Sequence, residues 1–213
     1  MVLKVNEIFT SLQGESSFAG LPCLFIRLTG CNLRCGWCDT KYAYDEGRDY
    51  SGMELVGLIN DSNIKLVEFT GGEPLLQKEE LIRIIGDVDQ EKTILIETNG
   101  SISLEGLPER VLTIADYKLK GSGEGGSFLE KNMGFLRKKD EIKFVLKDFS
   151  DYNEMRECYM KYDLGSKCGV LVSKIWNAEL SDGEIAEAIL KDRLNVRYQI
   201  QLHKYIWKDE KGR

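Results

Sequence analysis

The chain has 213 residues, 42% of them hydrophobic and 30% charged, a balance that excludes a fibre or a disordered chain. Its 29 basic and 35 acidic residues give a net charge of -6, whereas nucleic-acid-binding proteins usually carry a basic excess. The basic cluster at the C-terminal end, residues 204–213, is interrupted by Asp209 and Glu210. We therefore expect a small-molecule partner and no nucleic acid.

No apolar run reaches the ~20 residues that a membrane-spanning helix needs. Residues 1–7 lack a basic region followed by an apolar core, so no secretory signal is expected. We accordingly expect no membrane partner, a cytoplasmic location and a single domain over residues 1–213.

The predicted elements alternate between strands and helices along the chain. Strands rich in Val, Ile, Leu and Phe, as expected of strands covered on both faces, are predicted at 24–28, 66–69, 94–97, 112–116, 142–146, 170–173 and 198–202. The predicted helices are two that begin with capping boxes at Ser51 and Ser181, and two that span 75–85 and 152–162. The glycine-rich segment 121–126 is predicted to be a flexible loop, either a linker or a lid.

This alternation predicts a parallel sheet with right-handed crossovers. A complete eight-unit barrel takes ~250 residues. We therefore predict an α/β fold, an incomplete, modified TIM-like barrel with about six parallel strands and reduced helices. Ligands bind at the carboxyl ends of the strands in such folds, and polar or glycine-containing segments follow most of the predicted strands.

Three cysteines, Cys31, Cys35 and Cys38, follow the predicted strand 24–28. In a chain without a secretory signal, clustered cysteines are more often metal ligands than disulfides. A structural zinc site usually needs four ligands, and no fourth cysteine or histidine lies nearby. Three thiolates would leave one iron of a four-iron cluster open. The alternatives are a zinc site completed by Asp39 and a redox-inert thiol cluster.

The spacing Cys31-x3-Cys35-x2-Cys38, with an aromatic residue before the third cysteine, resembles the signature of the radical S-adenosylmethionine (radical SAM) superfamily. The segment 71–74, Gly-Gly-Glu-Pro, resembles the GGEP motif of that superfamily. Its glycines would expose backbone groups, and its glutamate could accept hydrogen bonds from a cationic amino group. The same four residues also suit a turn that enters a helix. The resemblance implies a [4Fe-4S] cluster on the three cysteines and S-adenosylmethionine on the open iron.

Two further segments, 9–16 and 25–40, closely resemble the 7-carboxy-7-deazaguanine synthase family, with Ser16 in place of a glycine. The resemblance implies a lyase of queuosine and 7-deazapurine biosynthesis. It would convert 6-carboxy-5,6,7,8-tetrahydropterin to 7-carboxy-7-deazaguanine and ammonia, with Mg2+ as a further cofactor. A radical derived from S-adenosylmethionine would remove hydrogen from the pterin, whose ring then contracts.

The resemblance also assigns site residues. The substrate residues would be Leu12, Gln13, Gly14, Glu15, Arg27, Thr70 and His203. The cofactor residues would be Trp37, Asp39, Gly72, Glu73, Thr98, Asn99, Asp116, Tyr117, Lys118 and Ser173. The metal ligands would be Cys31, Cys35 and Cys38 for the cluster and Thr40 for Mg2+, because a hydroxyl suits that ion.

Four of these assignments have a structural alternative. Glu15 could only cap a loop, Arg27 could form a surface ion pair, and Thr40 could be a helix N-cap. His203 could be structural. Lys143, in the predicted strand 142–146, is predicted to point outward to solvent.

Two rival functions share some of these motifs. One is a radical SAM activase that acts on a protein partner, and the other is an iron–sulfur electron carrier. An activase need not have the segment 13–15 or Arg27, and an electron carrier needs no GGEP motif. The resemblance implies a homodimer and an electron donor such as flavodoxin.

Overall fold

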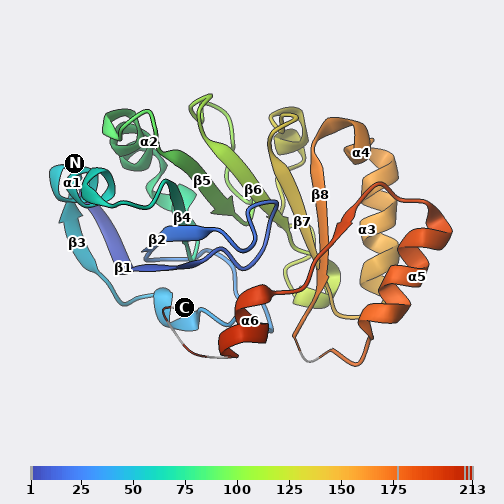
Figure 1. Ribbon diagram of the computed structural model, residues 1–213. Helices are drawn as coiled ribbons and strands as arrows, with labels where there is room; N and C mark the ends of the chain where they lie inside the picture. The colour runs from blue at the N-terminus through green and yellow to red at the C-terminus, as the bar shows by residue number, and fades with distance from the viewer. Residues whose placement is uncertain (1, 177, 209, 211, 213) are drawn as a thin grey trace.

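The computed structural model describes residues 2–176, 178–208, 210 and 212, so Asp209 and two basic residues of the C-terminal cluster, Lys211 and Arg213, lie outside the described part. Nine strands form one sheet in the order β3-β1-β2-β4-β5-β6-β7-β8-β9 (Figure 1). The parallel strands are β2 (Pro22–Leu28), β4 (Leu66–Gly71), β5 (Thr93–Thr98), β6 (Leu112–Tyr117), β7 (Glu141–Leu146), β8 (Gly169–Lys174) and β9 (Arg197–Tyr198).

At one edge a single strand, β1, runs against this direction. β1 (Val2–Leu12) pairs antiparallel with β2 on one side and with β3 (Arg48–Ser51) on the other. Among the described residues no ladder joins β3 to β9, so the sheet remains open. The predicted incomplete barrel with a parallel sheet is therefore confirmed, with the antiparallel edge as an addition.

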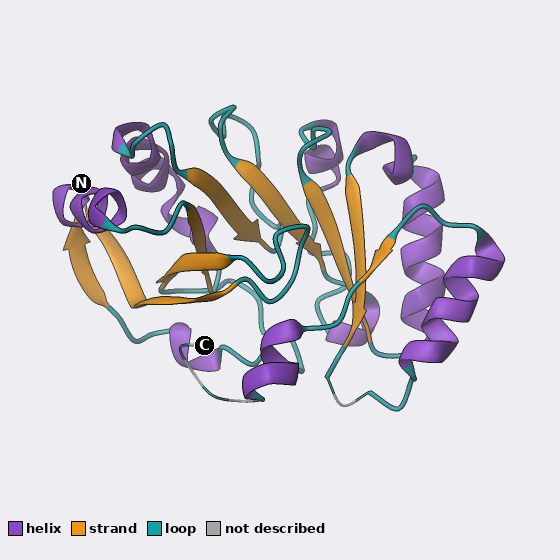
Figure 2. Cartoon of the chain, viewed as in Figure 1, coloured by secondary structure: helices purple, strands orange, loops and turns teal. Residues whose placement is uncertain are grey.

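The helices are short and few. They are α1 (Gly52–Asp61), α2 (Lys78–Asp87), α3 (Phe149–Lys161), α4 (Leu164–Lys167), α5 (Asp182–Asp192) and α6 (Leu202–Trp207), with 3-10 turns η1 (Lys41–Ala43), η2 (Pro74–Gln77), η3 (Lys120–Ser122) and η4 (Glu130–Gly134). Both predicted capping boxes are present, at the starts of α1 and α5. Figures 1 and 2 show α1 to α5 along the outside of the sheet, with α6 apart from them at the strand ends. No described helix is long and apolar enough to cross a membrane.

Several predicted elements differ from the structure. The predicted strand 198–202 is reduced to β9, and the helix α6 begins at Leu202. The strand β1 was not predicted, because Lys4, Asn6 and Thr10 interrupt its apolar residues. Such alternation is typical of a strand whose two faces meet different surroundings.

Side chains alternate between the two faces of the sheet. Residues such as Ile26, Phe69 and Phe144 belong to the large core between the sheet and the helices. The inner face carries a smaller core of Cys23, Phe25, Leu66, Leu95, Ile114 and Leu171. This inner core fills one end of the incomplete barrel, and polar residues occupy the same face toward the carboxyl ends of the strands.

Candidate active site

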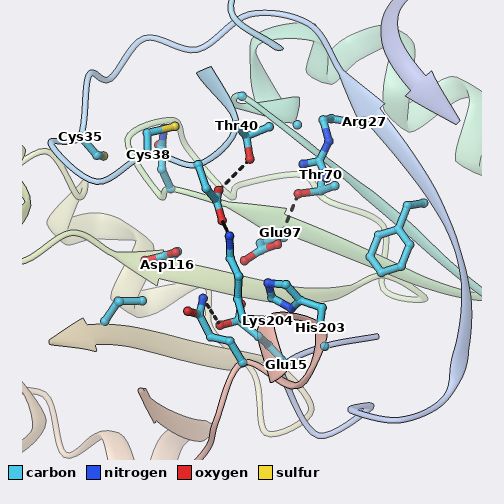
Figure 3. Close-up of a pocket in the computed structure, with 18 of the residues that line it drawn as sticks. Glu15, Arg27, Cys35, Cys38, Thr40, Thr70, Glu97, Asp116, His203 and Lys204 are labelled. Atoms are coloured by element: carbon cyan, nitrogen blue, oxygen red, sulfur yellow. Dashed lines mark hydrogen bonds and ion pairs between the residues drawn. The ribbon is translucent and has the colours of Figure 1, made fainter. Parts of the chain in front are cut away.

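A cavity of about 670 Å3 opens at the carboxyl ends of the strands. Its wall combines the ends of β2, β4, β5 and β6, part of β7, the cysteine loop after β2, the segment 12–15 after β1, and residues 201–204. Figure 3 shows side chains from these separate segments meeting around one space. The rim at which the sequence predicted a site therefore does enclose a chamber of ligand size.

The three clustered cysteines line this cavity as free, half-buried thiols. The backbone amide of Leu33 donates to Sγ of Cys31 at 3.4 Å, and that of Gly36 donates to the carbonyl of Ser122 at 2.9 Å. The segment 121–126 thus packs on the cysteine loop. Among the described residues no three His, Cys, Asp or Glu side chains converge on a single metal ion. A four-iron cluster does not need such convergence, because each cysteine binds a different iron.

The Gly-Gly-Glu-Pro motif holds the loop after β4 against the cysteine loop. Gly71 has a φ of 145°, and a Cβ on Gly72 would overlap the carbonyl oxygen of Gly30 and lie 2.7 Å from Cβ of Cys31. The buried Glu73 accepts hydrogen bonds from the amides of Leu75 (2.9 Å) and Asn99 (2.7 Å) and from the hydroxyl of Thr98 (2.7 Å). These three donors engage both carboxylate oxygens, and Glu73 is not among the residues that line the cavity. A contact between Glu73 and the cofactor stays a prediction.

The floor of the cavity holds a buried network of charges. Nζ of Lys143, in β7, lies 2.8 Å from Glu15 and 3.2 Å from Asp116, and it also pairs with Glu97. Nζ of Lys118 lies 2.9 Å from Asp116. The prediction that Lys143 points to solvent is therefore wrong. It shares the inner face of β7 with Val145, while Ile142, Phe144 and Leu146 face the helices.

This network keeps its members ionised. Burial opposes the charge on Lys143, but its three carboxylate partners outweigh burial and raise its pKa well above the ordinary value. Burial likewise opposes ionisation of Glu97 and Asp116, and the two lysines outweigh it, so the pKa of each carboxyl is lowered. The Oδ1 of Asp116 has no hydrogen-bond partner among the described residues, although it is buried. That oxygen is an acceptor available to a ligand.

The segment after β1 forms the opposite wall. Oε1 of Gln13 accepts from the amide of Glu15 at 2.9 Å, and its Nε2 donates to the buried Glu68. A Cβ on Gly14 would overlap the imidazole of His203, so the ring packs directly on this backbone. Burial lowers the pKa of His203, which keeps the ring neutral at neutral pH. Gln201 donates to Glu15 at 3.1 Å (Figure 3).

Arg27 and Thr40 line the chamber on the side away from Glu15 (Figure 3). Nε of Arg27 donates to Glu7 at 2.7 Å, and the guanidinium carbon lies 5.6 Å from the ring centre of Phe9. Thr40 precedes η1 without capping it, and its hydroxyl donates to Asp39 at 2.9 Å. The carboxylate of Asp39 in turn pairs with Lys204 of α6 at 3.2 Å.

Comparison with known proteins decides the family. A model of the radical SAM superfamily matches residues 25–122. A 7-carboxy-7-deazaguanine synthase of Koribacter versatilis is 40% identical over 98% of this chain and 98% of that protein. One of Thermoplasma acidophilum is 38% identical over 98% of this chain and 99% of that protein. The chain belongs to the 7-carboxy-7-deazaguanine synthase family. As a radical SAM enzyme it uses a [4Fe-4S] cluster and S-adenosylmethionine.

Solved structures agree with the fold of the synthase family. The chain is similar to the crystal structure of QueE from Escherichia coli, with a TM-score of 0.75 and 22% identity over 93% of this chain and 94% of that one. It also resembles SuiB of Streptococcus suis bound to S-adenosylmethionine, with a TM-score of 0.56 and 12% identity over 84% of this chain and 51% of that one.

Most residues that the resemblance to the synthase family assigned do line the chamber. They are Leu12, Gln13, Gly14, Glu15, Arg27, Cys31, Cys35, Trp37, Cys38, Asp39, Thr40, Thr70, Gly72, Thr98, Asn99, Asp116, Lys118 and His203. Besides Glu73, two others do not. Tyr117 faces the helices, where its ring lies 5.0 Å from that of Phe128, because it alternates with Asp116 along β6. Ser173 is buried beside the chamber, and Ile175 and Trp176 form the wall instead.

Sequence reasoning missed several residues of the chamber wall. Besides Lys143, these include Glu68 and Glu97 on neighbouring strands, and Gln201 and Lys204 at the C-terminal end. The signal for Glu68 and Glu97 was available. Each is a single acidic residue inside an otherwise apolar strand, which only a polar interior accommodates. No comparable signal in the sequence pointed to Gln201 and Lys204.

Proposed function

We propose that this enzyme converts 6-carboxy-5,6,7,8-tetrahydropterin to 7-carboxy-7-deazaguanine and ammonia in queuosine or 7-deazapurine biosynthesis. One observation carries the proposal. A single chamber holds the cysteine triad at one side and the segment 12–15, Arg27 and His203 around the remaining space. The 40% and 38% identical synthases match this chain along almost its whole length. We further propose one radical SAM domain over residues 1–213.

The polar groups of the chamber suit the two ends of a carboxypterin. The carboxylate of Glu15 would accept hydrogen bonds from the amino and ring N–H groups. Among the described residues, Arg27 bonds to Glu7 through Nε alone, so its terminal nitrogens are available to a substrate carboxylate. Thr40 would bind Mg2+ through its hydroxyl beside the carboxylate of Asp39. Thr70 lies between these ends and donates to Glu97 at 3.3 Å.

Bound to Cys31, Cys35 and Cys38, the cluster together with S-adenosylmethionine would supply the radical that removes hydrogen from C6 of the pterin. The chain's own residues bind, orient and shield. Asn99 faces the cysteines, its side-chain amide 4.0 Å from Sγ of Cys31. The free oxygen of Asp116 would accept a hydrogen bond from the cofactor. Ile175 and Trp176 would exclude water from one side.

The decisive experiment is an anaerobic turnover with reconstituted enzyme, S-adenosylmethionine, reductant, Mg2+ and the carboxytetrahydropterin. We expect a product lighter than the substrate by one ammonia, absent with Cys35→Ala. Cys168→Ala serves as a matched control, since that buried cysteine lies outside the chamber. Cleavage of S-adenosylmethionine without conversion of the pterin would refute this substrate and favour an activase with a protein partner.

Three properties of the working enzyme are also proposed here. We propose a homodimer, an electron donor such as flavodoxin and a cytoplasmic location, by analogy with the family. Gel filtration tests the first, and replacing a chemical reductant by reduced flavodoxin in the turnover tests the second. Localisation of the expressed protein tests the third.

A further inference from the structure

Lys143 joins three elements of the chain at one buried point. It stands on β7 with 4% of its surface exposed. Its ammonium group pairs with Glu15 from the segment after β1, with Glu97 from β5 and with Asp116 from β6. The register explains two of these partners. Asp116 is the direct neighbour of Lys143 across the ladder between β6 and β7, and Glu97 of β5 pairs with Ile114, two residues before Asp116. The third, Glu15, reaches the same point from a loop.

Negative charges outnumber positive ones around this point, by one with Lys143 and by two without it. Glu15, Glu97 and Asp116 are three carboxylates, and Lys118 is the other lysine beside them, 2.9 Å from Asp116. Like charges that share a site of low dielectric repel one another strongly. Loss of the Lys143 ammonium would therefore force one carboxylate to take up a proton or to move away.

Glu15 is the partner with most freedom to move. Glu97 and Asp116 are fixed by the backbone ladders of their strands, whereas Glu15 lies in the loop that follows β1. Its other oxygen is held by the neutral amide of Gln201 at 3.1 Å. The position of Glu15, and with it the substrate wall of the chamber, thus depends on the contact with Lys143.

We propose that Lys143 is a positioning residue that fixes Glu15 at the substrate end against Glu97 and Asp116 at the cofactor end of the chamber. This inference rests on the proposed function and names the device that keeps substrate and cofactor aligned. Lys143 acts through its three carboxylates. Correct alignment matters because a displacement of about 1 Å in a bound reactant can lower a rate about a hundredfold.

The test compares Lys143→Met, Lys143→Arg and a matched control, Lys92→Met. The Lys92 ammonium donates to the backbone of Ser62 and Ile64 at the opposite end of the sheet. Titration calorimetry measures the affinity of the reconstituted holoenzyme, with S-adenosylmethionine present, for the carboxytetrahydropterin. A second measurement follows 5'-deoxyadenosine released per molecule of product.

We expect Lys143→Met to weaken pterin binding by about tenfold or more, the effect of one lost charged hydrogen bond. It should also raise the 5'-deoxyadenosine released per product, which a purely structural defect would leave unchanged. Lys143→Arg keeps the charge and the fold but changes the reach of the donor, so it should raise KM several-fold with a smaller change in kcat. Lys92→Met should match the wild type in both readouts.

Two results would overturn the positioning role. One is wild-type affinity and wild-type 5'-deoxyadenosine release in Lys143→Met. The other, decisive where Lys143→Met does not fold, is a Lys143→Arg enzyme with unchanged KM. The wild-type turnover separates this inference from the proposed function. If the wild type converts no pterin, the proposed function fails, whereas a wild type that turns over beside an unaffected Lys143 variant refutes the positioning role alone.

Discussion

Nζ of Lys204 lies 3.2 Å from Oδ2 of Asp39, so an ion pair joins α6 to the residue that follows the third clustered cysteine. No residue of α6 is buried. The helix is held by this pair, by the amide of Leu202 donating to the carbonyl of Gly14 at 2.9 Å, and by the neighbouring Gln201. Polar contacts, and not an apolar face, therefore keep α6 over the chamber.

We predict that Lys204→Met loosens α6. The partner Asp39 is 56% exposed, so the pair is partly screened and its loss should be mild. Backbone amides of α6 should exchange with deuterium about two- to fivefold faster, as expected for an ion pair of this kind. Lys191→Met, in the last turn of α5, is the control and should leave exchange in α6 unchanged. Unaltered exchange in Lys204→Met would show that α6 does not depend on this pair.

We predict that Gly72→Ala prevents the cluster from being assembled. The added Cβ would overlap the carbonyl oxygen of Gly30 and press on Cβ of Cys31, and backbone cannot give way as a flexible side chain can. Iron content after reconstitution should fall severalfold. Gly57→Ala is the matched control, because a Cβ there, within α1, meets no described atom inside 4 Å. That control should keep its iron and gain up to about 1 kcal/mol of stability.

Glu73→Gln should destabilise the fold. Its carboxylate accepts from two backbone amides and one hydroxyl, and a glutamine side chain would turn a donor toward at least one of these donors. A buried group left without its hydrogen bond costs about 1–3 kcal/mol. Urea unfolding should reveal that loss, with Glu79→Gln, an exposed position in α2, as the comparison. Equal midpoints for both variants would contradict this structural role.

The stability of the enzyme should depend on pH through Glu68. Burial, reinforced by Glu97, raises the pKa of this carboxyl well above its ordinary value. The folded state thus keeps a proton that the unfolded state loses above about pH 4.3, and stability falls as pH rises beyond that value. Glu68→Gln mimics the protonated group and cannot ionise.

The Tm of Glu68→Gln minus the Tm of the wild type should therefore increase as pH rises from about 5 to about 8. Thermal melts across that range measure the difference. Glu79→Gln, at an exposed position of α2, is the control. A Tm difference that shrinks as pH rises would mean that Glu68 is ionised in the folded enzyme.

Much of the fold followed from local sequence patterns. Ser51 and Ser181 start helices because a hydroxyl three residues before a glutamate satisfies free amides at a helix start. The buried parallel strands were visible as apolar runs. The strand β1 was not visible in this way, because its polar residues interrupt the apolar run. The strand β9 is shorter than the predicted strand 198–202, because only Arg197 and Tyr198 pair with β8.

The site was predicted where motifs are contiguous and missed where it depends on which face a side chain occupies. In β7, Glu-Ile-Lys-Phe-Val-Leu, the side chains of Lys143 and Phe144 point to opposite faces of the sheet. The sequence pattern predicts that a lysine on the face away from the core points to solvent. In this fold the face opposite the core is a chamber lined by charge. For Glu73 the sequence shows the adjacent residues of the motif, but it does not show that Thr98 and Asn99 donate hydrogen bonds to the carboxylate.

The open sheet has a consequence for how the chamber admits ligands. A closed barrel has a circumference fixed by strand number and stagger. This sheet is open among the described residues, and α6 lies over the chamber. Two side-chain contacts help to hold it there, Gln201 with Glu15 and Lys204 with Asp39. Widening of the chamber at α6 would break these two contacts and the backbone hydrogen bond from Leu202 to Gly14, but it would not separate strands. Substituents on the side of a substrate that faces α6 should be tolerated more readily than those that face the rigid strands β4 to β6.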